Sequence, residues 1–274
     1  MSFFISLFVV SYLFVLTPSV ESLIPFWQKI TTARPVRSQA YYDSFKAIPT
    51  KEETAEKLMK SFLTTARVSG KDKPRRRTKV EDTVAILDSS GSVGDCEFNK
   101  GKRALKDLMM IRRPPIFVNY YAGVVYSTTA TVKFKFLPAF EAAKKMNDFF
   151  YEGGITNTAD ALSKAYDLLF DKNSGSHFPS RKMVFLLTDG KSNKNQDQTI
   201  PNADDLKDHN VEIYVVAVGD FTSDINEVVD IASSPETHLL RVKTVGDFLG
   251  VVKLVVKKVD PDTYKVISKV PPPC

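Results

Sequence analysis

The sequence is poor in the residues on which many catalytic and metal sites depend. Its 274 residues include 2 cysteines, 3 histidines and 1 tryptophan. The histidines, His177, His209 and His238, lack the spacing of metal ligands, so we expect them at surface or loop positions. The chain also has no Gly-x-Gly-x-x-Gly, no phosphate loop ending in Gly-Lys-Ser/Thr and no Gly-x-Ser-x-Gly turn. These absences predict that the chain is not an enzyme.

Long apolar runs are absent from the sequence except at its start. Residues 2–16 are nearly all apolar, and the small residues Val20 and Ser22 follow in a pattern that signal peptidase accepts. A run of about 14 apolar residues is shorter than the roughly 20 that span a bilayer. We therefore predict a signal peptide over residues 1–22, a secreted protein and no membrane-spanning segment. No Asn-x-Ser/Thr sequon occurs, so a glycan-dependent role is not expected.

Positive charge is concentrated in an N-terminal arm, residues 23–78. This arm has 13 Lys and Arg against 5 Asp and Glu, whereas the rest of the chain from Lys79 is close to neutral. The block Lys73–Arg77 could contact heparin or be a processing site, but a solvated linker is the favoured interpretation because so short a block binds polyanions weakly. We predict no specific nucleic-acid binding.

The arm also contains a helix signal near residues 51–67. Thr50 and Glu53 have the spacing of a capping box, and an apolar stripe at helical period follows, comprising Ala55, Leu58, Met59, Phe62, Leu63 and Ala66. An apolar stripe must be buried against another surface. Docking on the neighbouring domain and self-association both remain open.

Three side chains that contain oxygen follow an apolar run at alternate sequence positions. Asp88, Ser90 and Ser92 follow the run Val84–Leu87, and residues at this spacing in an extended chain project to one side. Gly91 permits the sharp turn that would bring their oxygens together. Hard oxygen ligands suit a small divalent cation. The alternative for such a serine-rich turn is a helix N-cap.

Two later segments supply further oxygen ligands. In one, a pair of glycines precedes Thr156 and Thr158 at the start of a helical pattern; in the other, an apolar run from Met183 ends in Asp189 and Gly190. In an open parallel sheet, side chains beyond the carboxyl ends of the strands share one crevice. Asp88 and Asp189 are therefore expected to face the same site.

These three motifs, Asp-x-Ser-x-Ser, Gly-Gly-x-Thr-x-Thr and Leu-Leu-Thr-Asp-Gly, resemble the von Willebrand factor A domain over residues 79–259. The resemblance implies a metal-ion-dependent adhesion site with an intact ligand set: Asp88, Ser90, Ser92, Thr156 and Asp189. Thr158 is expected to start a helix and to support these ligands. The implied metal is magnesium or manganese, with calcium as a further candidate. The implied partner is an extracellular protein, such as a collagen, a matrix glycoprotein or a receptor, that completes the metal shell with an Asp or Glu.

Alternating strand and helix patterns independently predict an α/β fold. We expect a Rossmann-like open sheet, mostly parallel with one antiparallel edge strand, flanked by helices on both faces. The predicted strands are Val84–Leu87, Phe117–Tyr126, Val132–Phe136, one from Met183, Val211–Val218 and Leu239–Val242. The predicted helices are Phe98–Met109, Ala139–Phe150, Ala159–Phe170, Ala203–Asp208, Ile225–Ala232 and Val245–Lys258.

The two cysteines lie far apart in the sequence. Cys96 is expected near the metal loop, and Cys274 ends a proline-rich tail, residues 260–274. An oxidising compartment favours pairing, and the spacing leaves intrachain and intermolecular bonds equally open. The favoured function is metal-dependent binding of an extracellular protein. The alternative is a structural component of an extracellular or mineralised matrix that self-associates through the arm helix and Cys274.

Overall fold

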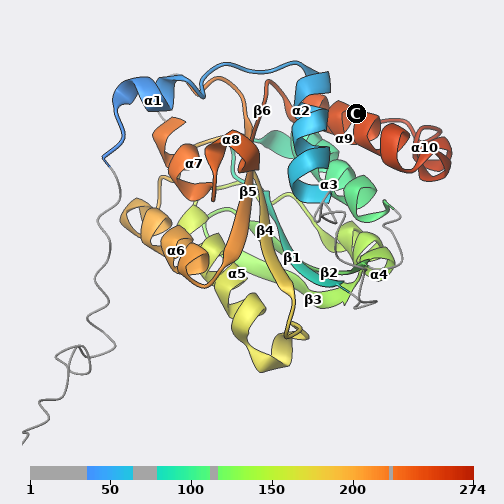
Figure 1. Cartoon of the computed structure of the whole chain (residues 1–274), viewed down its shortest axis with the longest axis horizontal. Coiled ribbons are helices and arrows are strands. Elements are labelled where there is room, and N and C mark those ends of the chain that lie inside the picture. The colour runs from blue at the N-terminus through green and yellow to red at the C-terminus, as the bar shows by residue number, and fades with distance from the viewer. Residues whose placement is uncertain (1–35, 64–78, 112–116, 222–224) are drawn as a thin grey trace, which may run out of the picture. The chain divides into compact units, whose positions relative to one another are not determined.

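A six-stranded sheet forms the centre of the computed structural model, which describes residues 36–63, 79–111, 117–221 and 225–274 (Figure 1). Its strand order is β3-β2-β1-β4-β5-β6, and only the β2–β3 pair is antiparallel. The strands are β1 (Lys79–Asp88), β2 (Phe117–Tyr126), β3 (Ala130–Pro138), β4 (Arg181–Thr188), β5 (Val211–Val218) and β6 (Leu239–Val242). The predicted α/β class with one antiparallel edge strand is confirmed.

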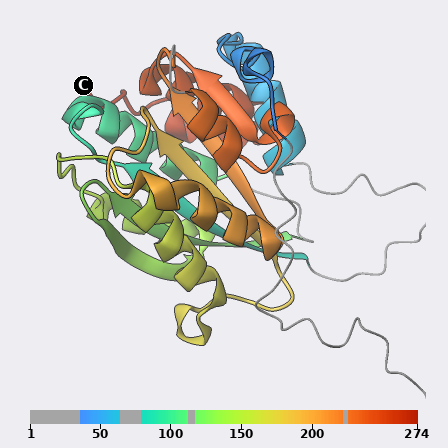
Figure 2. The ribbon, with the colours of Figure 1, turned by 90° about the vertical axis from the view of Figure 1, so that its left-hand side faces the viewer.

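Each face of the sheet has its own apolar core, because successive side chains of a strand point to opposite faces. In β1, Val84 and Ile86 belong to one core, and Ala85 and Leu87 to the other. The first core is covered by α5 (Thr158–Phe170), α6 (Gln196–Asp208) and α7 (Ile225–Ile231); the second by α3 (Gly94–Met109), α4 (Ala139–Lys145) and α9 (Val245–Val259) (Figure 2). Helices on both faces explain the apolar runs Val84–Leu87 in β1, Met183–Leu187 in β4 and Ile213–Val218 in β5.

Several helices differ from the sequence prediction. The helix from Ala139 ends at Lys145 and continues as a 3-10 turn, Met146–Asp148, instead of reaching Phe150. Helix α6 begins at Gln196, seven residues before the predicted start, and contains Pro201. A proline in the second turn costs one intrahelical hydrogen bond, which the packing of the buried Ala203 and Leu206 offsets. The predicted tail contains a further helix, α10 (Pro261–Ile267).

The start signals of α10 are visible in the sequence but were not recognised. Asp260 is the N-cap, its carboxylate accepts from Thr263 N–H at 3.1 Å, and Pro261 occupies the first helical position.

The described helices include none that could span a membrane, since each of them is too short or too polar.

The apolar stripe of the N-terminal arm is buried on the same domain. Two short helices, α1 (Gln39–Asp43) and α2 (Lys51–Leu58), precede a π-helical turn, Met59–Leu63, and belong to one compact unit with the rest of Ser38–Cys274. The Phe62 ring is 1% exposed and packs edge-on against Phe185 and Tyr214. The arm helix thus contributes to the core of its own chain. Residues 1–35 and 64–78, with the expected signal peptide and the block Lys73–Arg77, lie outside the described residues.

A polar cluster under the arm corrects the expectation for one histidine. Arg181 donates to Glu212 through Nε at 2.7 Å and reaches the carbonyl oxygens of Ser61 and Phe62. His238, whose side chain is 15% exposed, lies against the ring of Tyr214, so it is not a surface residue. The cluster therefore fixes the end of the arm to β4 and β5.

The two cysteines are bonded to each other within the chain. Cys96, in the first turn of α3, is linked to Cys274 across 178 residues. The bond holds the segment after α10 against α3, at the end of the sheet where β1 terminates. It leaves neither thiol of the chain free.

Candidate functional site

The predicted ligands converge where β1 and β4 end. These strands pair in parallel, with Leu87 opposite Leu187, so the loops after them are neighbours. Ser90 Oγ lies 3.2 Å from Ser92 Oγ, and Ser92 donates to Asp189 Oδ1 at 2.9 Å. The structure thus joins four of the five predicted residues, counting Asp88 through its bond with Ser90 N–H at 2.8 Å.

Asp88 lies buried at the bottom of the site. Its side chain accepts from Ser90 N–H through Oδ1, and from the hydroxyls of Tyr126 at 2.9 Å and Thr188 at 2.8 Å through Oδ2. The residue is 1% exposed, and this burial raises the pKa of its carboxyl although the hydrogen bonds oppose the shift. Asp88 therefore lies beneath the other predicted ligands and not at the surface. With both oxygens engaged, Asp88 is also badly placed to attack a substrate as a nucleophile.

Asp189 lies closer to solvent and close to the charge of Asp88. Burial, followed by repulsion from Asp88, raises the pKa of Asp189 to about 6, while the hydrogen bond from Ser92 opposes the rise. Two neighbouring carboxylates that are partly removed from water favour a positive charge between or beside them. Ser90 is buried and Ser92 is exposed, so the two serine hydroxyls lie at different depths, one at the bottom of the site and one at its surface.

Thr156 is held in place through its backbone. Its N–H donates to Asn193 Oδ1 at 2.8 Å, and its carbonyl oxygen accepts from Asn193 N–H and Lys194 N–H. Ser192 adds a hydroxyl bond to the same carbonyl at 3.2 Å. Ser192 and Asn193 were not predicted from the sequence: their polar side chains follow Asp189-Gly190 directly, but nothing in that pattern indicates Thr156 as their partner. These contacts join the loop of Thr156 to the loop of Asp189.

The pair of glycines brings the loop of Thr156 against the loop of the serines. Gly91 N–H donates to Gly154 C=O at 2.8 Å. Gly154 has φ +100°, and a Cβ there would lie 2.6 Å from Thr128 Oγ1, so no other residue fits this close approach without strain. Of the five predicted ligands, Thr156 is the one whose described hydrogen bonds reach none of the other four; they run from its backbone to Ser192, Asn193 and Lys194.

Thr158 occupies the first position of α5 and is 1% exposed. Asn157, and not a threonine, is the N-cap, with its Oδ1 accepting from Asp160 N–H at 3.2 Å. The Thr158 hydroxyl is a buried oxygen with no hydrogen-bond partner among the described residues. This hydroxyl interacts with the hydroxyl of Tyr126, which in turn donates to Asp88, so Thr158 lies under the site.

The donor set fits a hard divalent cation. It consists of hydroxyl and carboxylate oxygens, which magnesium, manganese and calcium prefer. In the described part of the chain no three His, Cys, Asp or Glu side chains gather around a common point. A metal in this cleft would therefore depend on the serine and threonine hydroxyls, with Ser90, Ser92, Thr156 and Asp189 as the residues that could hold it and Asp88 supplying charge beneath them.

Comparison with known proteins identifies the class. The family model of the von Willebrand factor type A domain matches residues 82–253, and the chain belongs to this family. It is 30% identical to the collagen alpha-1(XII) chain of Notophthalmus viridescens over 64% of its length, 26% identical to von Willebrand factor of Rattus norvegicus over 53%, and 30% identical to matrilin-3 of Gallus gallus over 60%. It spans 18%, 33% and 37% of these relatives' own lengths.

Solved structures share the fold. Proximal thread matrix protein 1 from the mussel byssus aligns with a TM-score of 0.56 at 22% identity, covering 66% of this chain and 48% of that one. A second structure of the mussel protein, described as having a zinc-occupied metal-ion-dependent adhesion site, aligns with a TM-score of 0.54 over 67% and 46% of the two chains. The similarity to matrix and adhesion proteins supports an extracellular protein-binding role.

Proposed function

We propose that this chain is a secreted matrix or adhesion protein that binds an extracellular protein through a divalent cation at the loops where β1 and β4 end. Ser90, Ser92, Thr156 and Asp189 hold the cation, Asp88 contributes charge from below, and the partner supplies an Asp or Glu oxygen. A collagen, a matrix glycoprotein or a receptor could present such a side chain.

The contact from Ser92 Oγ to Asp189 Oδ1 carries the proposal. A hydroxyl and a carboxylate from different loops, 97 residues apart, meet at 2.9 Å at a solvent-exposed position. The same oxygens can turn toward a cation with little movement of the backbone. The zinc-occupied adhesion site described for the mussel protein supports a divalent cation at the corresponding end of the fold.

The low charge of the donor set favours capture of an acidic side chain. Only Asp88 and Asp189 bring negative charge to the cation, and the hydroxyl ligands are neutral. The protein therefore does not surround the cation with excess negative charge, and the metal can still attract a further anion. Magnesium and manganese suit the site because they retain water and accept few protein carboxylates. Calcium, which takes six to eight oxygens, would need more ligands from the partner or from water.

The alternative was a matrix component that self-associates through the arm helix and Cys274, and in the structure neither of these two features is free for that role. The apolar stripe of α2 is buried on its own domain, where Leu58 is fully buried, and Cys274 is bonded to Cys96 of the same chain. Self-association would therefore need a different surface.

Calorimetric titration tests the proposal. The full-length secreted chain, stripped with EDTA, is titrated with MgCl2 and MnCl2, with and without acetate as a stand-in for the partner's carboxylate. Asp189→Asn keeps the size of the side chain and an acceptor for Ser92, but it removes a charge. Asp262→Asn is the matched control, since Asp262 is 72% exposed on α10.

We expect saturable binding that acetate strengthens, that Asp189→Asn weakens at least about tenfold, and that Asp262→Asn leaves unchanged. An unchanged affinity in Asp189→Asn would place the cation elsewhere. Absence of binding to the wild-type chain with acetate present would remove the metal from the proposal.

A further inference from the structure

Lysines gather on the last two helices of the chain. Residues 253–269 include five lysines and two aspartates, although the chain from Lys79 onward is close to neutral. The lysines lie on α9, on α10 and in the turn after α10, and all except the first are exposed: Lys253, Lys257, Lys258, Lys265 and Lys269. Positive charge is therefore concentrated on this part of the surface of a nearly neutral domain.

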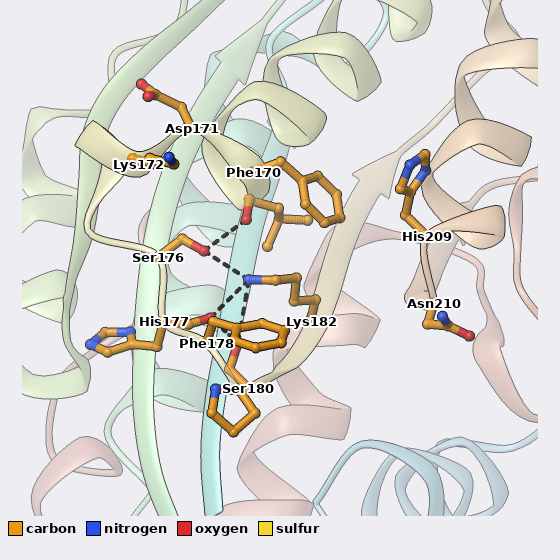
Figure 3. Close-up of a pocket in the computed structure, with 12 residues that line it drawn as sticks. Phe170, Asp171, Lys172, Ser176, His177, Phe178, Ser180, Lys182, His209 and Asn210 are labelled. Carbon is orange, nitrogen blue, oxygen red and sulfur yellow. Dashed lines mark hydrogen bonds between the residues drawn. The ribbon is translucent and has the colours of Figure 1, made fainter. Parts of the chain in front are cut away.

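Most of these lysines have no acceptor for their N–H groups. Four of them make no hydrogen bond and no salt bridge with the described residues: Lys253, Lys257, Lys258 and Lys269. Lys265 pairs with Asp262 at 3.0 Å, but the two side chains are 74% and 72% exposed, and such a pair contributes little. In contrast, Lys182 donates through Nζ to Ser176 Oγ at 2.7 Å and to His177 C=O at 3.1 Å (Figure 3). The lysines of α9 and α10 thus keep donors that a ligand can use.

Helix stability explains only part of this arrangement. Lys257 and Lys258 are in the last turn of α9, where positive charge interacts favourably with the helix dipole. Lys253 lies four residues before Lys257, and like charges at this spacing destabilise a helix. Lys269 lies beyond the end of α10. A surface that served only stability and solubility would intersperse the two signs of charge.

Helix α3 extends the positive surface. It packs against α9, and Arg103 on α3 donates to the carbonyl oxygen of Ile267, at the end of α10, at 3.2 Å. Asp107 on the same helix has a side chain that is 3% exposed, and burial raises the pKa of its carboxyl. The charges of Arg103, Lys253 and Lys106 oppose this rise, so three cations surround one carboxylate. Figure 1 shows α3, α9 and α10 next to one another.

The backbone that carries these cations is held in place. The disulfide of the chain fixes the segment after α10 to α3. Lys269 lies in a hydrogen-bonded turn, in which its N–H donates to Val266 C=O at 3.4 Å. Lys257 Nζ lies 5.8 Å from the centroid of the Tyr264 ring, which joins the surfaces of α9 and α10. The backbone positions of the cations are therefore set before a ligand binds, so binding does not have to order the chain.

The chemistry of this surface fits a polymer with closely spaced negative charges. Such a polymer is attracted by several ammonium groups at once, and its binding releases counterions. Membrane insertion uses large apolar side chains, and single-stranded nucleic acids stack on exposed aromatic rings. The exposed large apolar side chains here are three valines, 41%, 67% and 44% exposed: Val259, Val266 and Val270. Electrostatic attraction therefore has to supply most of the affinity.

We propose that the basic face, formed by Arg103, Lys253, Lys257, Lys258, Lys265 and Lys269, binds a sulfated polysaccharide. Sulfate oxygens accept from the lysine and arginine N–H groups, and the charges of the polymer replace the missing acidic partners of the face. The choice of a polysaccharide over a nucleic acid rests on the extracellular location of the function proposed above. The binding itself needs no cation.

Calorimetric titration of the full-length secreted chain with a heparin octasaccharide, in EDTA, tests this proposal. A neutral-face variant changes three exposed lysines to glutamine: Lys257→Gln, Lys258→Gln and Lys269→Gln. An arginine variant changes the same three residues to arginine and keeps their charge. The matched control removes the same charge from exposed lysines elsewhere: Lys60→Gln, Lys135→Gln and Lys172→Gln. Circular dichroism checks that all variants fold.

We expect the neutral-face variant to bind heparin at least about tenfold more weakly than the wild-type chain in about 0.15 M NaCl. The slope of log affinity against log salt concentration should become shallower by about three, one for each lysine. The control and the arginine variant should bind at least as tightly as the wild-type chain. The N-terminal arm also contains a basic block, so the comparison between variants decides the result. Equal affinity of the neutral-face variant and the wild-type chain would overturn the proposal, as would an equal loss in the control.

Two further probes compare the classes of polyanion. Polyglutamate represents an acidic protein, and double-stranded DNA represents a nucleic acid. Heparin should bind more tightly than either at equal concentration of charge. Tighter binding of polyglutamate would assign the face to an acidic protein, and tighter binding of DNA would assign it to a nucleic acid; either result would overturn the proposal. Because all these titrations are made in EDTA, their failure leaves the cation site untouched.

Discussion

Ser92 and Asp189 are hydrogen-bonded at 2.9 Å although 97 residues separate them. The contact follows from the sheet: β1 and β4 are adjacent and parallel, so their carboxyl ends release both residues at the same edge. Beneath this pair, Asp88 is enclosed by the hydroxyls of Tyr126 and Thr188. The site thus has an accessible layer of ligands over a buried charge, and substitutions in the two layers should differ in effect.

Asp88→Ala is expected to lose stability as well as metal binding. The change leaves the hydroxyls of Tyr126 and Thr188 and the N–H of Ser90 without their acceptor, and a buried donor without a partner costs about 1–3 kcal/mol. Urea unfolding followed by circular dichroism measures this loss. Asp88→Asn, which keeps one acceptor oxygen, should lose less stability but still bind magnesium weakly. Equal stability of Asp88→Ala and the wild-type chain would contradict the buried position of Asp88.

Thr156→Ala is expected to weaken magnesium binding more than Thr158→Ala. The described bonds of Thr156 run through its backbone, which the substitution keeps, so its hydroxyl is available for the cation. Thr158 lies buried at the start of α5, below the ligands. Titration calorimetry should show a loss of about tenfold or more for Thr156→Ala and a smaller loss for Thr158→Ala. Thr156→Ser, which restores the hydroxyl, is the control, and the reverse order of the two alanine variants would exchange the roles of the threonines.

The fold could be predicted because apolar runs of strand length alternate in the sequence with segments whose apolar residues recur at the helical period. Buried strands such as Val211–Val218 are almost uninterrupted apolar runs, and Leu239–Val242 has the predicted bounds in the structure. The convergence of the predicted ligands could also be predicted, because the carboxyl ends of parallel strands lie at the same edge of a sheet. Contacts between distant segments could not be predicted in this way. Neither Tyr126, which bonds to Asp88 across the sheet, nor Asn193, which orients Thr156, belongs to a local pattern that indicates its partner.

Helix boundaries were harder to predict where tertiary packing outweighs local preference. The helix predicted from Ala203 starts instead at Gln196 and includes Pro201. The destination of the arm helix was left open because an apolar stripe specifies burial but not the surface that buries it. The structure supplies that surface in Phe185 and Tyr214, which contact Phe62.

Phe62→Ala should therefore destabilise the whole domain. The ring is 1% exposed between Phe185 and Tyr214, and truncation of a buried phenylalanine costs about 3–5 kcal/mol. Urea unfolding should show one cooperative transition at a lower midpoint. Val266→Ala is the control because Val266 is 67% exposed on α10, and its midpoint should not change. A wild-type midpoint for Phe62→Ala would mean that the arm is not part of the folded core.

Glu212 should make stability depend on pH in the acidic range. Its burial raises the pKa, but hydrogen bonds from Arg181, then His238, outweigh burial and lower the pKa of Glu212 to about 2 from the usual 4.5. Because the folded pKa is the lower one, this stabilisation is present above about pH 4.5 and is lost as the pH falls toward 2. The side chain is 37% exposed, and solvent screening reduces the expected contribution to about 1 kcal/mol.

Urea unfolding of the wild-type chain and of Glu212→Gln, at several pH values from about 6 to about 3, measures this contribution. The difference in unfolding free energy between the two proteins should be largest at pH 6 and should shrink as the pH falls, because the wild-type glutamate becomes protonated in the unfolded chain. Glu56→Gln, at an exposed pair with Lys60, should show no such trend. A difference that stays constant with pH would mean that the charge of Glu212 does not stabilise the arm cluster, and that Arg181 acts through its other partners, which include Ser61 and Phe62.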